Sequence, residues 1–532
     1  MAHSEKRNAG KPAPAGKPAP AGKPAPAGKP APAGKPAPAG KPAPAGKRFL
    51  ALDLGAESGR GVLGTLDAGK VRLAEVGRFR NGPVNVLGGL HWDALSIFQH
   101  VKDILSACAE GGALDGVGVD TWGVDFALLG ADGGLLANPY HYRDARTMGM
   151  FQEAFKLVPR EEIFERTGIQ FMEINTLYQL LAMARAQSPA LGAAQRLLMM
   201  PDLFHYWLTG EAMGEFTIAT TSQCYDPRAG DWARGMLQKM GIPTQVFPPI
   251  IKPGTKLGPL ASSVASATGA QAPVIAPASH DTASAVAAVP AKGDDWCYIS
   301  SGTWSLMGVE VPQPIITDAA LKYNFTNEGG VAATYRFLKN IGGLWLVQES
   351  RRTWAREGRE MGYDELAALA GEAKPLVSVV EPDHPSFLHP GDMPSRIRQF
   401  CVESGQPEPG DVGALVRCIL ESLALKYRWV LERLEEMLGR RIARVHIVGG
   451  GTQNTLLSQL AADAMQRPVI AGPVEATAIG NIMIQAIAVG EVGSLAEARE
   501  IVGASFPTTT YEPRPAAGWD ETYERYRALA EG

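Results

Sequence analysis

The sequence predicts an α/β protein in which two similar domains face each other across a central cleft. Three observations indicate this class. The stretch Val274–Val289 has the pattern of an apolar strand, a small-residue turn and an Ala/Val-rich helix. In the second half, a strand that leads into the loop Ser300–Thr303 repeats the pattern of an early strand that leads into the turn 55–60. The segment that begins at Arg444 again reads as a strand, a glycine-rich turn and a helix.

The composition is that of a globular protein with a large core, because 45% of the 532 residues are hydrophobic and 20% are charged. No segment approaches the roughly 18 consecutive apolar residues of a membrane-spanning helix. The first residues lack the apolar centre of a secretory signal. We therefore expect a cytoplasmic protein without a membrane partner.

Five cysteines are scattered along the chain without a C-x-x-C pair, which argues against a zinc ribbon or a thioredoxin-like redox site. We expect buried free thiols. A disulfide between Cys401 and Cys418 is the alternative, because these residues flank a Pro/Gly turn, but a reducing cytosol disfavours it.

Residues 1–47 differ from the rest of the chain, since six copies of GKPAPA run from Gly10 to Ala45. Alternating proline and lysine favour an extended, solvated tether. This tail contains nine basic residues and one acidic residue, whereas the remainder contains 42 basic and 54 acidic residues. The tail could contact polyanions, although a solvated spacer is favoured and its partner stays unknown. The acidic body argues against a nucleic-acid-binding protein.

The first candidate site is the polar turn within FLALDLGAESGRGVLGTL, residues 49–66. Glycines at 55 and 59 permit a tight, hairpin-like turn that gathers an acid, a hydroxyl group and a cation. In a nucleotide-binding interpretation, Asp53 holds Mg²⁺ through water while Ser58 and the turn amides face phosphates. The alternative is a polar hairpin with an Asp/Arg surface pair.

A second candidate site lies in the strand GVGVDTWGVDFALLG, which carries Asp120, Trp122 and Asp125 around Gly123. A tryptophan flanked by carboxylates can stack on the C–H face of a sugar while the acids accept its hydroxyl protons. The alternative is a core tryptophan with a capping aspartate. More polar residues follow at 140–147, and only closeness to the first group would make them part of a site.

Helical patterns then dominate from Met148 to about Leu208 and suggest a cap over the substrate. After this cap, the turn at Ser279–Thr282 places Asp281 directly ahead of a helix. The loop Ser300–Thr303 offers backbone N–H groups and hydroxyl groups that suit a phosphate. The pattern therefore predicts an acid beside a phosphate cradle. The alternative is that Asp281 only caps the helix.

Glycines 449–451 follow a strand and precede a helix, where an adenine ring or an α-phosphate could approach bare backbone. A tight strand–helix turn is equally consistent with three glycines. Upstream, FLKNIGGLWLVQES places Asn340 and Gln348 around an apolar helix.

Together, seven strings resemble the FGGY carbohydrate kinases: DLGAESGR at 53–60, DTWGVDF at 120–126, YRDART at 142–147, ASHDTASAV at 278–286, SSGTWSLMG at 300–308, KNIGGLWLVQES at 339–350 and VGGGTQN at 448–454. The resemblance covers residues 48 to about 513 and leaves the tail outside. It implies an actin-like ATPase (RNase H-like) fold with two domains around a central cleft. It divides the chain into a mainly sugar-binding domain at 48–290, a mainly nucleotide-binding domain at 291–513 and a C-terminal helical extension at 514–532.

The resemblance also implies roles for single residues. It makes Asp281 the general base and places Gly123 and His280–Thr282 against a ketose. With the residues suggested by the local patterns, the predicted substrate site is Trp122, Gly123, Asp125, Arg143, His280, Asp281 and Thr282. The predicted ATP site is Ala56, Glu57, Ser58, Gly59, Arg60, Thr303, Asn340, Gln348, Gly449, Gly450 and Gly451.

Two further expectations concern the phosphate side. Asp53 is the expected Mg²⁺ ligand, through water. Glu57 departs from the family's pattern by adding a carboxylate to a phosphate-facing turn, so its side chain should point away or interact through the metal.

The implied reaction transfers the γ-phosphoryl group of Mg²⁺-ATP to a primary hydroxyl group of a ketose, whose proton Asp281 accepts. The most discriminating strings are TWGVDF, SHDTASAV and SSGTWSLMG, and they favour L-rhamnulose, with fuculose and xylulose as alternatives within the family. A filament-forming or chaperone-like actin-type ATPase is the alternative from another class, because the fold alone would not exclude it.

Overall fold

The computed structural model describes residues 46–515 and 517–531. The repeat predicted to form a tether, residues 10–45, lies outside the described residues. The first strand, β1 (Lys47–Leu54), includes Lys47, which the sequence analysis assigned to the tail. Within the described ranges, no helix is both long and apolar enough to cross a membrane.

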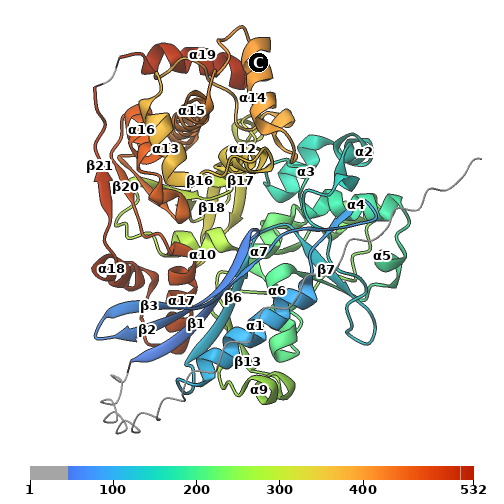
Figure 1. The fold of residues 1–532 in the computed structure, drawn as a ribbon. Coiled ribbons are helices and arrows are strands. Elements are labelled where there is room, and N and C mark those ends of the chain that lie inside the picture. The colour runs from blue at the N-terminus through green and yellow to red at the C-terminus, as the bar shows by residue number, and fades with distance from the viewer. Residues whose placement is uncertain (1–45, 516, 532) are drawn as a thin grey trace, which may run out of the picture. The chain divides into compact units, whose positions relative to one another are not determined.

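The first large sheet has six strands, and it is built from the N-terminal half of the chain (Figure 1). β1 pairs antiparallel with β2 and parallel with β6. In spatial order the strands are β13 (Thr255–Pro259), β14 (Pro273–Ala276), β6 (Gly116–Thr121), β1, β2 (Ser58–Asp67) and β3 (Lys70–Arg80).

The second large sheet has seven strands and repeats this arrangement, because β15 pairs antiparallel with β16 and parallel with β19. In spatial order its strands are β17 (Thr326–Gly329), β18 (Tyr335–Ile341), β16 (Ser305–Val311), β15 (Trp296–Ser301), β19 (Arg444–Val448), β20 (Val469–Ala471) and β21 (Thr509–Tyr511). The internal repeat predicted from the sequence is therefore present in the strand pairing.

Helices cover both faces of the first sheet. One face packs against α1 (Ala94–Ala109), α6 (Met200–Thr209) and α9 (Ser262–Thr268). The other face packs against α10 (Asp281–Ala287) and α17 (Ala476–Val489). α17 belongs to the C-terminal part of the chain, yet Figure 1 shows it against the blue strands. The second sheet packs on one face against α12 (Trp345–Arg356), α15 (Val412–Leu438) and α16 (Thr455–Met465).

The remaining elements are further helices and four small two-stranded sheets in the described part of the chain. The other helices are α2 (Met150–Leu157), α3 (Arg160–Thr167), α4 (Thr176–Arg185), α5 (Pro189–Ala193), α7 (Phe216–Ala219), α8 (Arg234–Lys239), α11 (Asp318–Lys322), α13 (Tyr363–Glu372), α14 (Met393–Glu403), α18 (Leu495–Ser505) and α19 (Trp519–Glu531). Four small sheets pair β4 (Val84–Val86) with β5 (Gly89–His91), β7 (Phe126–Leu129) with β8 (Arg196–Met199), β9 (Gly214–Glu215) with β12 (Ile250–Ile251) and β10 (Tyr225–Asp226) with β11 (Asp231–Trp232).

The alternation of side chains along β1 places the site residue Asp53. Leu50, Leu52 and Leu54 point to the face covered by α1, whereas Phe49 and Ala51 point to α10 and α17. Because side chains alternate with a period of two, Asp53 lies on the face of Phe49 and Ala51. That face is shared, since Tyr298 and Leu306 of the second sheet join the same hydrophobic cluster.

α10 and α17 approach each other closely at Gly480. A Cβ atom added to Gly480 would overlap the carbonyl oxygen of Ser284 in α10. Only glycine lets the two backbones come this near. This contact fixes the distance between α10 and α17.

Two large sheets with helices on their faces confirm the predicted α/β class. The predicted boundaries at 47/48, 290/291 and 513/514 stay predictions, although the second falls in the segment that joins α10 to β15. All five cysteines are buried free thiols, and the alternative of a disulfide between Cys401 and Cys418 is wrong for this structure.

Candidate active site

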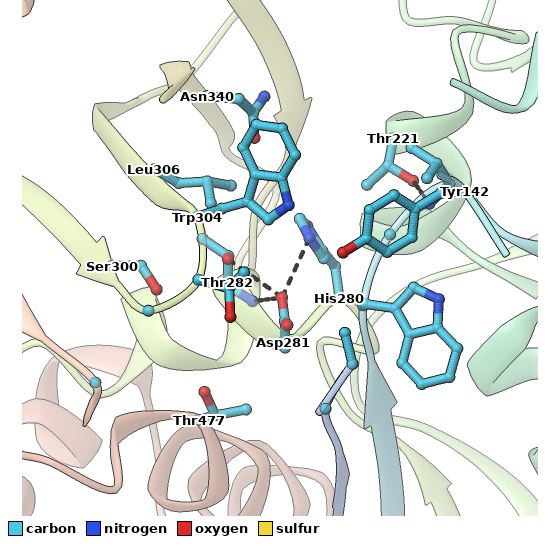
Figure 2. A pocket seen from close by; sticks show the side chains of 18 of the residues that line it. Tyr142, Thr221, His280, Asp281, Thr282, Ser300, Trp304, Leu306, Asn340 and Thr477 are labelled. Atoms are coloured by element: carbon cyan, nitrogen blue, oxygen red, sulfur yellow. Dashed lines mark hydrogen bonds and ion pairs between the residues drawn. The ribbon is translucent and has the colours of Figure 1, made fainter. Parts of the chain in front are cut away.

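A cavity of about 360 Å³ lies between the two large sheets and is lined by turns that follow strands of both. The first sheet contributes the turn between β1 and β2, and the second contributes the turn between β15 and β16. Figure 2 shows Asp281 at the centre, with Ser300 and Thr477 on one side and Tyr142 and Thr221 on the other. The predicted residues that line it are Asp53, Ala56, Glu57, Ser58, Arg60, Trp122, Gly123, His280, Asp281, Thr282, Thr303, Asn340, Gly449 and Gly450.

Two turns of the second sheet form a cradle of backbone and small side chains. Ser300 and Ser301 end β15, Gly302–Trp304 connects β15 to β16, and Gly449 and Gly450 follow β19. The turns touch, because a Cβ atom at Gly451 would overlap the Ser301 hydroxyl group. Gly449 has a φ of 89°, which favours glycine. The predicted phosphate loop and the predicted triple-glycine turn are thus adjacent.

The turn between β1 and β2 brings charged groups to the same cavity. Arg60 donates from Nε and Nη2 to Oδ2 of Asp53, at 3.0 and 2.8 Å. Its Nη1 lies 2.5 Å from Oε2 of Glu475, so two carboxylates share one guanidinium group. Oδ1 of Asp53 has no hydrogen-bond partner among the described residues.

The charged groups around Asp53 indicate how the expected Mg²⁺ ion could be held. No group of three or more His, Cys, Asp or Glu side chains suited to a metal ion occurs in the described part of the chain. One free carboxylate oxygen beside the phosphate-facing turns fits an Mg²⁺ ion that arrives with the nucleotide and keeps most of its waters. Asp53 is therefore chemically suited to the predicted role.

Glu57 extends from this turn toward α12. Its carboxylate forms an ion pair with the guanidinium group of Arg352, which also lies 3.0 Å from Oε2 of Glu349. The expected redirection of Glu57 thus has a concrete partner, and that partner is an arginine of the second domain rather than a metal.

Asp281 is the first residue of α10, and the N-cap position before it belongs to His280. Oδ1 of Asp281 accepts from the Thr282 backbone at 2.5 Å and from the Thr282 hydroxyl group at 3.2 Å. The Nε2 atom of His280 also lies 3.2 Å from Oδ1. Oδ2 has no partner in residues 46–515 and 517–531, and the side chain is 33% exposed to the cavity.

Burial is the main cause of a raised pKa for Asp281, and the nearby charge of Asp53 adds to it. A carboxylate with a raised pKa is a stronger proton acceptor than an ordinary one. Asp281 therefore has a free oxygen and the basicity that a general base needs.

The expectation that Asp125 contacts a sugar is wrong, because Asp125 is fully buried and does not line the cavity. Its Oδ1 accepts from Gln179 at 2.9 Å, and its Oδ2 accepts from the indole of Trp122 at 3.0 Å. Trp122 lines the cavity but is only 5% exposed. Trp122 thus exposes only a small part of its surface, and Asp125 fixes its orientation.

The expectation that Arg143 binds substrate is also wrong, because its guanidinium group stacks 3.9 Å from the ring centre of Trp345 and donates to the carbonyl group of Leu388. Three residues of the predicted ATP site do not line the cavity either: Gly59, Gln348 and Gly451. Gly59 packs under the ring of Phe79, and Gln348 has a buried Oε1 atom without a partner among the described residues.

Other lining residues were missed by sequence reasoning. They are the side chains that close the half of the cavity away from the phosphate turns: Val124, Ile169, Gln170, Met172, Ile174, Asn175, Thr221 and Glu328. Most lie between the predicted capping helices, where no motif marks them. A buried glutamate in the strand TNEG was the one available signal, since acids are rarely buried without a partner.

Comparison with known sequences gives two adjoining family matches. Residues 49–288 match the N-terminal domain of the FGGY family of carbohydrate kinases, and residues 297–489 match the C-terminal domain of that family. The chain is 45% identical to the rhamnulokinase of Bacteroides thetaiotaomicron over 481 residues, which cover 90% of this chain and 98% of that relative. It is 42% identical to the rhamnulokinase of Pectobacterium carotovorum over 488 residues, which cover 91% and 96%.

Comparison of folds gives a consistent result. The crystal structure of a ligand-bound xylulose kinase from Lactobacillus acidophilus matches with a TM-score of 0.73 at 18% identity, covering 91% of this chain and 96% of that one. This likeness confirms the predicted actin-like ATPase fold with two similar domains.

Proposed function

Because the chain belongs to the FGGY family of carbohydrate kinases, we propose that it phosphorylates the 1-hydroxyl group of L-rhamnulose with ATP, in the breakdown of L-rhamnose. The products are L-rhamnulose 1-phosphate and ADP. The named relatives support this choice of sugar, since the chain is 45% and 42% identical to two rhamnulokinases over most of its length.

The observation that carries the proposal is the state of the two oxygens of Asp281. Thr282 donates two hydrogen bonds to Oδ1 and Nε2 of His280 lies 3.2 Å from it, while Oδ2 has no protein partner among the described residues. A carboxylate held in this way can accept one proton from a bound hydroxyl group without losing its own position. The primary hydroxyl group of a ketose at Oδ2 becomes a better nucleophile as its proton leaves.

The ATP phosphates occupy the side of the cavity formed by the turns at 55–60, 300–304 and 449–450. The ketose oxygen attacks the γ-phosphorus, the bond to the β,γ-bridging oxygen breaks, and ADP leaves with that electron pair. Asp281 holds the proton that the hydroxyl group loses. Asp53 would offer a carboxylate oxygen, through water, to the Mg²⁺ ion that accompanies the nucleotide.

The remaining roles follow the division of the cavity. Gly123, His280 and Thr282 contact the ketose, and a Cβ atom at Gly123 would come within 3.4 Å of Nε2 of His280. Ala56, Ser58, Arg60 and Thr303 face the phosphates. Asn340 donates to Gln170 and Glu328, each at 3.3 Å, so it supports the wall of the cavity from the second sheet.

A ketose panel tests the function. Purified protein with ATP should release ADP with L-rhamnulose, and more slowly with L-fuculose or D-xylulose. A control without sugar measures ATP hydrolysis alone. A faster reaction with fuculose or xylulose would change the sugar within the same family, whereas ADP release that does not depend on sugar would favour an actin-like ATPase instead.

A further inference from the structure

Arg336 is a fully buried arginine on β18, close to the base but outside the cavity lining. Its Nε atom donates to the carbonyl group of Gly329 at 2.8 Å, which fixes the guanidinium plane. Its Nη2 atom lies 3.0 Å from Nδ1 of His280 and 3.2 Å from Oε2 of Glu328. Arg336 and Glu328 come from the second sheet, whereas His280 precedes α10.

The contact with Nδ1 restricts the proton on His280. A guanidinium group only donates hydrogen bonds and does not lose its proton in proteins. Nδ1 must therefore accept from Arg336, which leaves the single ring proton on Nε2. Nε2 lies 3.2 Å from Oδ1 of Asp281, within reach for donation.

We propose that Arg336 is a positioning residue, which holds His280 in its neutral, Nε2-protonated form and so makes it a hydrogen-bond donor to Asp281. The order is then guanidinium to imidazole to carboxylate, from one domain to the other. This inference rests on the proposed function only in calling Asp281 the base; the proton arrangement stands by itself.

The alternative position of the ring proton, on Nδ1 of His280, would disturb the position of Asp281. Glu328 also lies near Nδ1, with Oε2 at 3.4 Å, and in the absence of Arg336 it would accept a hydrogen bond from a proton on that nitrogen. A neutral His280 with its proton on Nδ1 turns a lone pair on Nε2 toward the lone pairs of Asp281. That repulsion would swing the carboxylate and move Oδ2 from its place.

The charges around Arg336 balance within this network. Glu328 supplies one carboxylate beside the guanidinium group, so the pair is buried without net charge. Nη1 of Arg336 has no partner within the described ranges. The structure thus accepts an incompletely satisfied buried arginine, which an aliphatic side chain could replace if packing were its only purpose.

The first test uses wild-type protein without any substrate. A long-range ¹H–¹⁵N correlation spectrum of protein with ¹⁵N-labelled histidine separates the two neutral forms and the imidazolium at neutral pH. The signal of His280 is identified by its loss in His280→Gln. The inference requires protonation on Nε2 alone. Protonation on Nδ1, or on both nitrogens, would overturn it.

The second test is kinetic and uses three variants. Arg336→Met should lower kcat by about 10- to 100-fold, the usual effect of losing a partner that orients a working group, with the KM for ATP unchanged. Its His280 signal should move to the Nδ1-protonated or charged form. Arg336→Lys keeps a donor and should restore part of kcat and the Nε2-protonated signal.

Arg467→Gln is the matched control, because it removes another arginine that pairs with a glutamate, Glu435 at 3.0 Å, away from the cavity. It should leave kcat and the His280 signal unchanged. Loss of kcat in Arg336→Met with an unchanged signal would overturn the inference. If Arg336→Met does not fold, the wild-type spectrum still decides. Absence of ketose phosphorylation would overturn the proposed function and leave the proton assignment intact.

Discussion

Trp92 and Trp122 lie against each other with ring centres 4.0 Å apart, and both indole N–H groups donate to the same oxygen of Asp125. The two donor distances are 2.6 and 3.0 Å. Only Trp122 lines the cavity; Trp92 is fully buried. Replacing either tryptophan removes one hydrogen bond to Asp125, but only the replacement of Trp122 changes a side chain that a sugar in the cavity could contact.

Trp122→Phe should raise the KM for the ketose by roughly 2- to 10-fold, the range of a modest ring contact, and leave the KM for ATP unchanged. Trp92→Phe is the control and should lose stability without this change. Phenylalanine is preferred to alanine, because removing a buried tryptophan side chain costs about 3–5 kcal/mol of unfolding free energy. Equal effects of the two variants on the ketose KM would make Trp122 a core residue only.

Asp281→Asn should lower turnover by about 10² to 10⁴, the contribution of a positioned acid–base group, while ATP and ketose still bind. The amide oxygen can accept the bonds from His280 and Thr282, so the position of the side chain is kept. Calorimetric titration with each ligand and steady-state ADP release measure the two effects.

Asp93→Asn is the matched control for that variant, since Asp93 caps α1 by accepting from Ser96 at 3.1 Å. Aspartate and asparagine rank together as caps, so its turnover and stability should hardly change. If Asp281→Asn keeps more than about a tenth of wild-type turnover, against the expected range, Asp281 is not the base.

Arg352→Met should raise the KM for ATP about fivefold, because it exposes phosphates to the unpaired Glu57 carboxylate at a cost of ~1 kcal/mol in a water-rich site. Adding Glu57→Gln should restore the KM. Arg351→Met removes a neighbouring arginine of the same helix, which donates to the carbonyl group of Met361, and should have no effect. A double variant no better than Arg352→Met would show that Glu57 does not act on the phosphates.

Asp120→Asn should raise the melting temperature at neutral and alkaline pH. Asp120 is fully buried beside Asp53 and accepts from Asn481 at 2.5 Å, and burial holds its pKa well above the ordinary value. The folded chain therefore keeps a proton that the unfolded chain releases above about pH 4, so the free energy of unfolding falls as pH rises through that window.

Asparagine cannot ionise, so the advantage of Asp120→Asn should shrink as pH falls toward about 4, the ordinary value for aspartate. Thermal unfolding across this pH range, without nucleotide, measures it. Asp294→Asn, at an exposed loop position, is the control. A variant that is less stable than wild type at every pH would mean that the bond to Asn481 needs the carboxyl group itself.

Much of the fold could be predicted from the sequence, because the strands are short apolar runs that end at glycine-rich polar turns. The turns after β1, β15 and β19 were found in this way, and they carry the phosphate side of the cavity. Local patterns suffice where one turn supplies several neighbouring residues.

The sugar side could not be predicted as well, because its residues come together only through packing of distant segments. The sequence suggested that Trp122 and Asp125 bind a sugar together. In the structure, Trp92, which lies thirty residues before Trp122, donates to the same Asp125 carboxylate. Arg336 gave no signal beyond a charge inside the apolar strand YRFLKNI, and its partner His280 lies 56 residues away.

The absence of a side chain at Gly480 determines where α10 places the catalytic group Asp281. α17 rests on the first sheet, and the glycine lets α10 seat directly on it, with Asp281 three residues before the point of contact. One added methyl group would push α10 away from α17 and move the Asp281 carboxylate away from the ketose hydroxyl group. A misplacement of about 1 Å can cost about 10²-fold in rate. The rate of the reaction therefore depends on the absence of a Cβ atom at Gly480, a position that does not line the cavity.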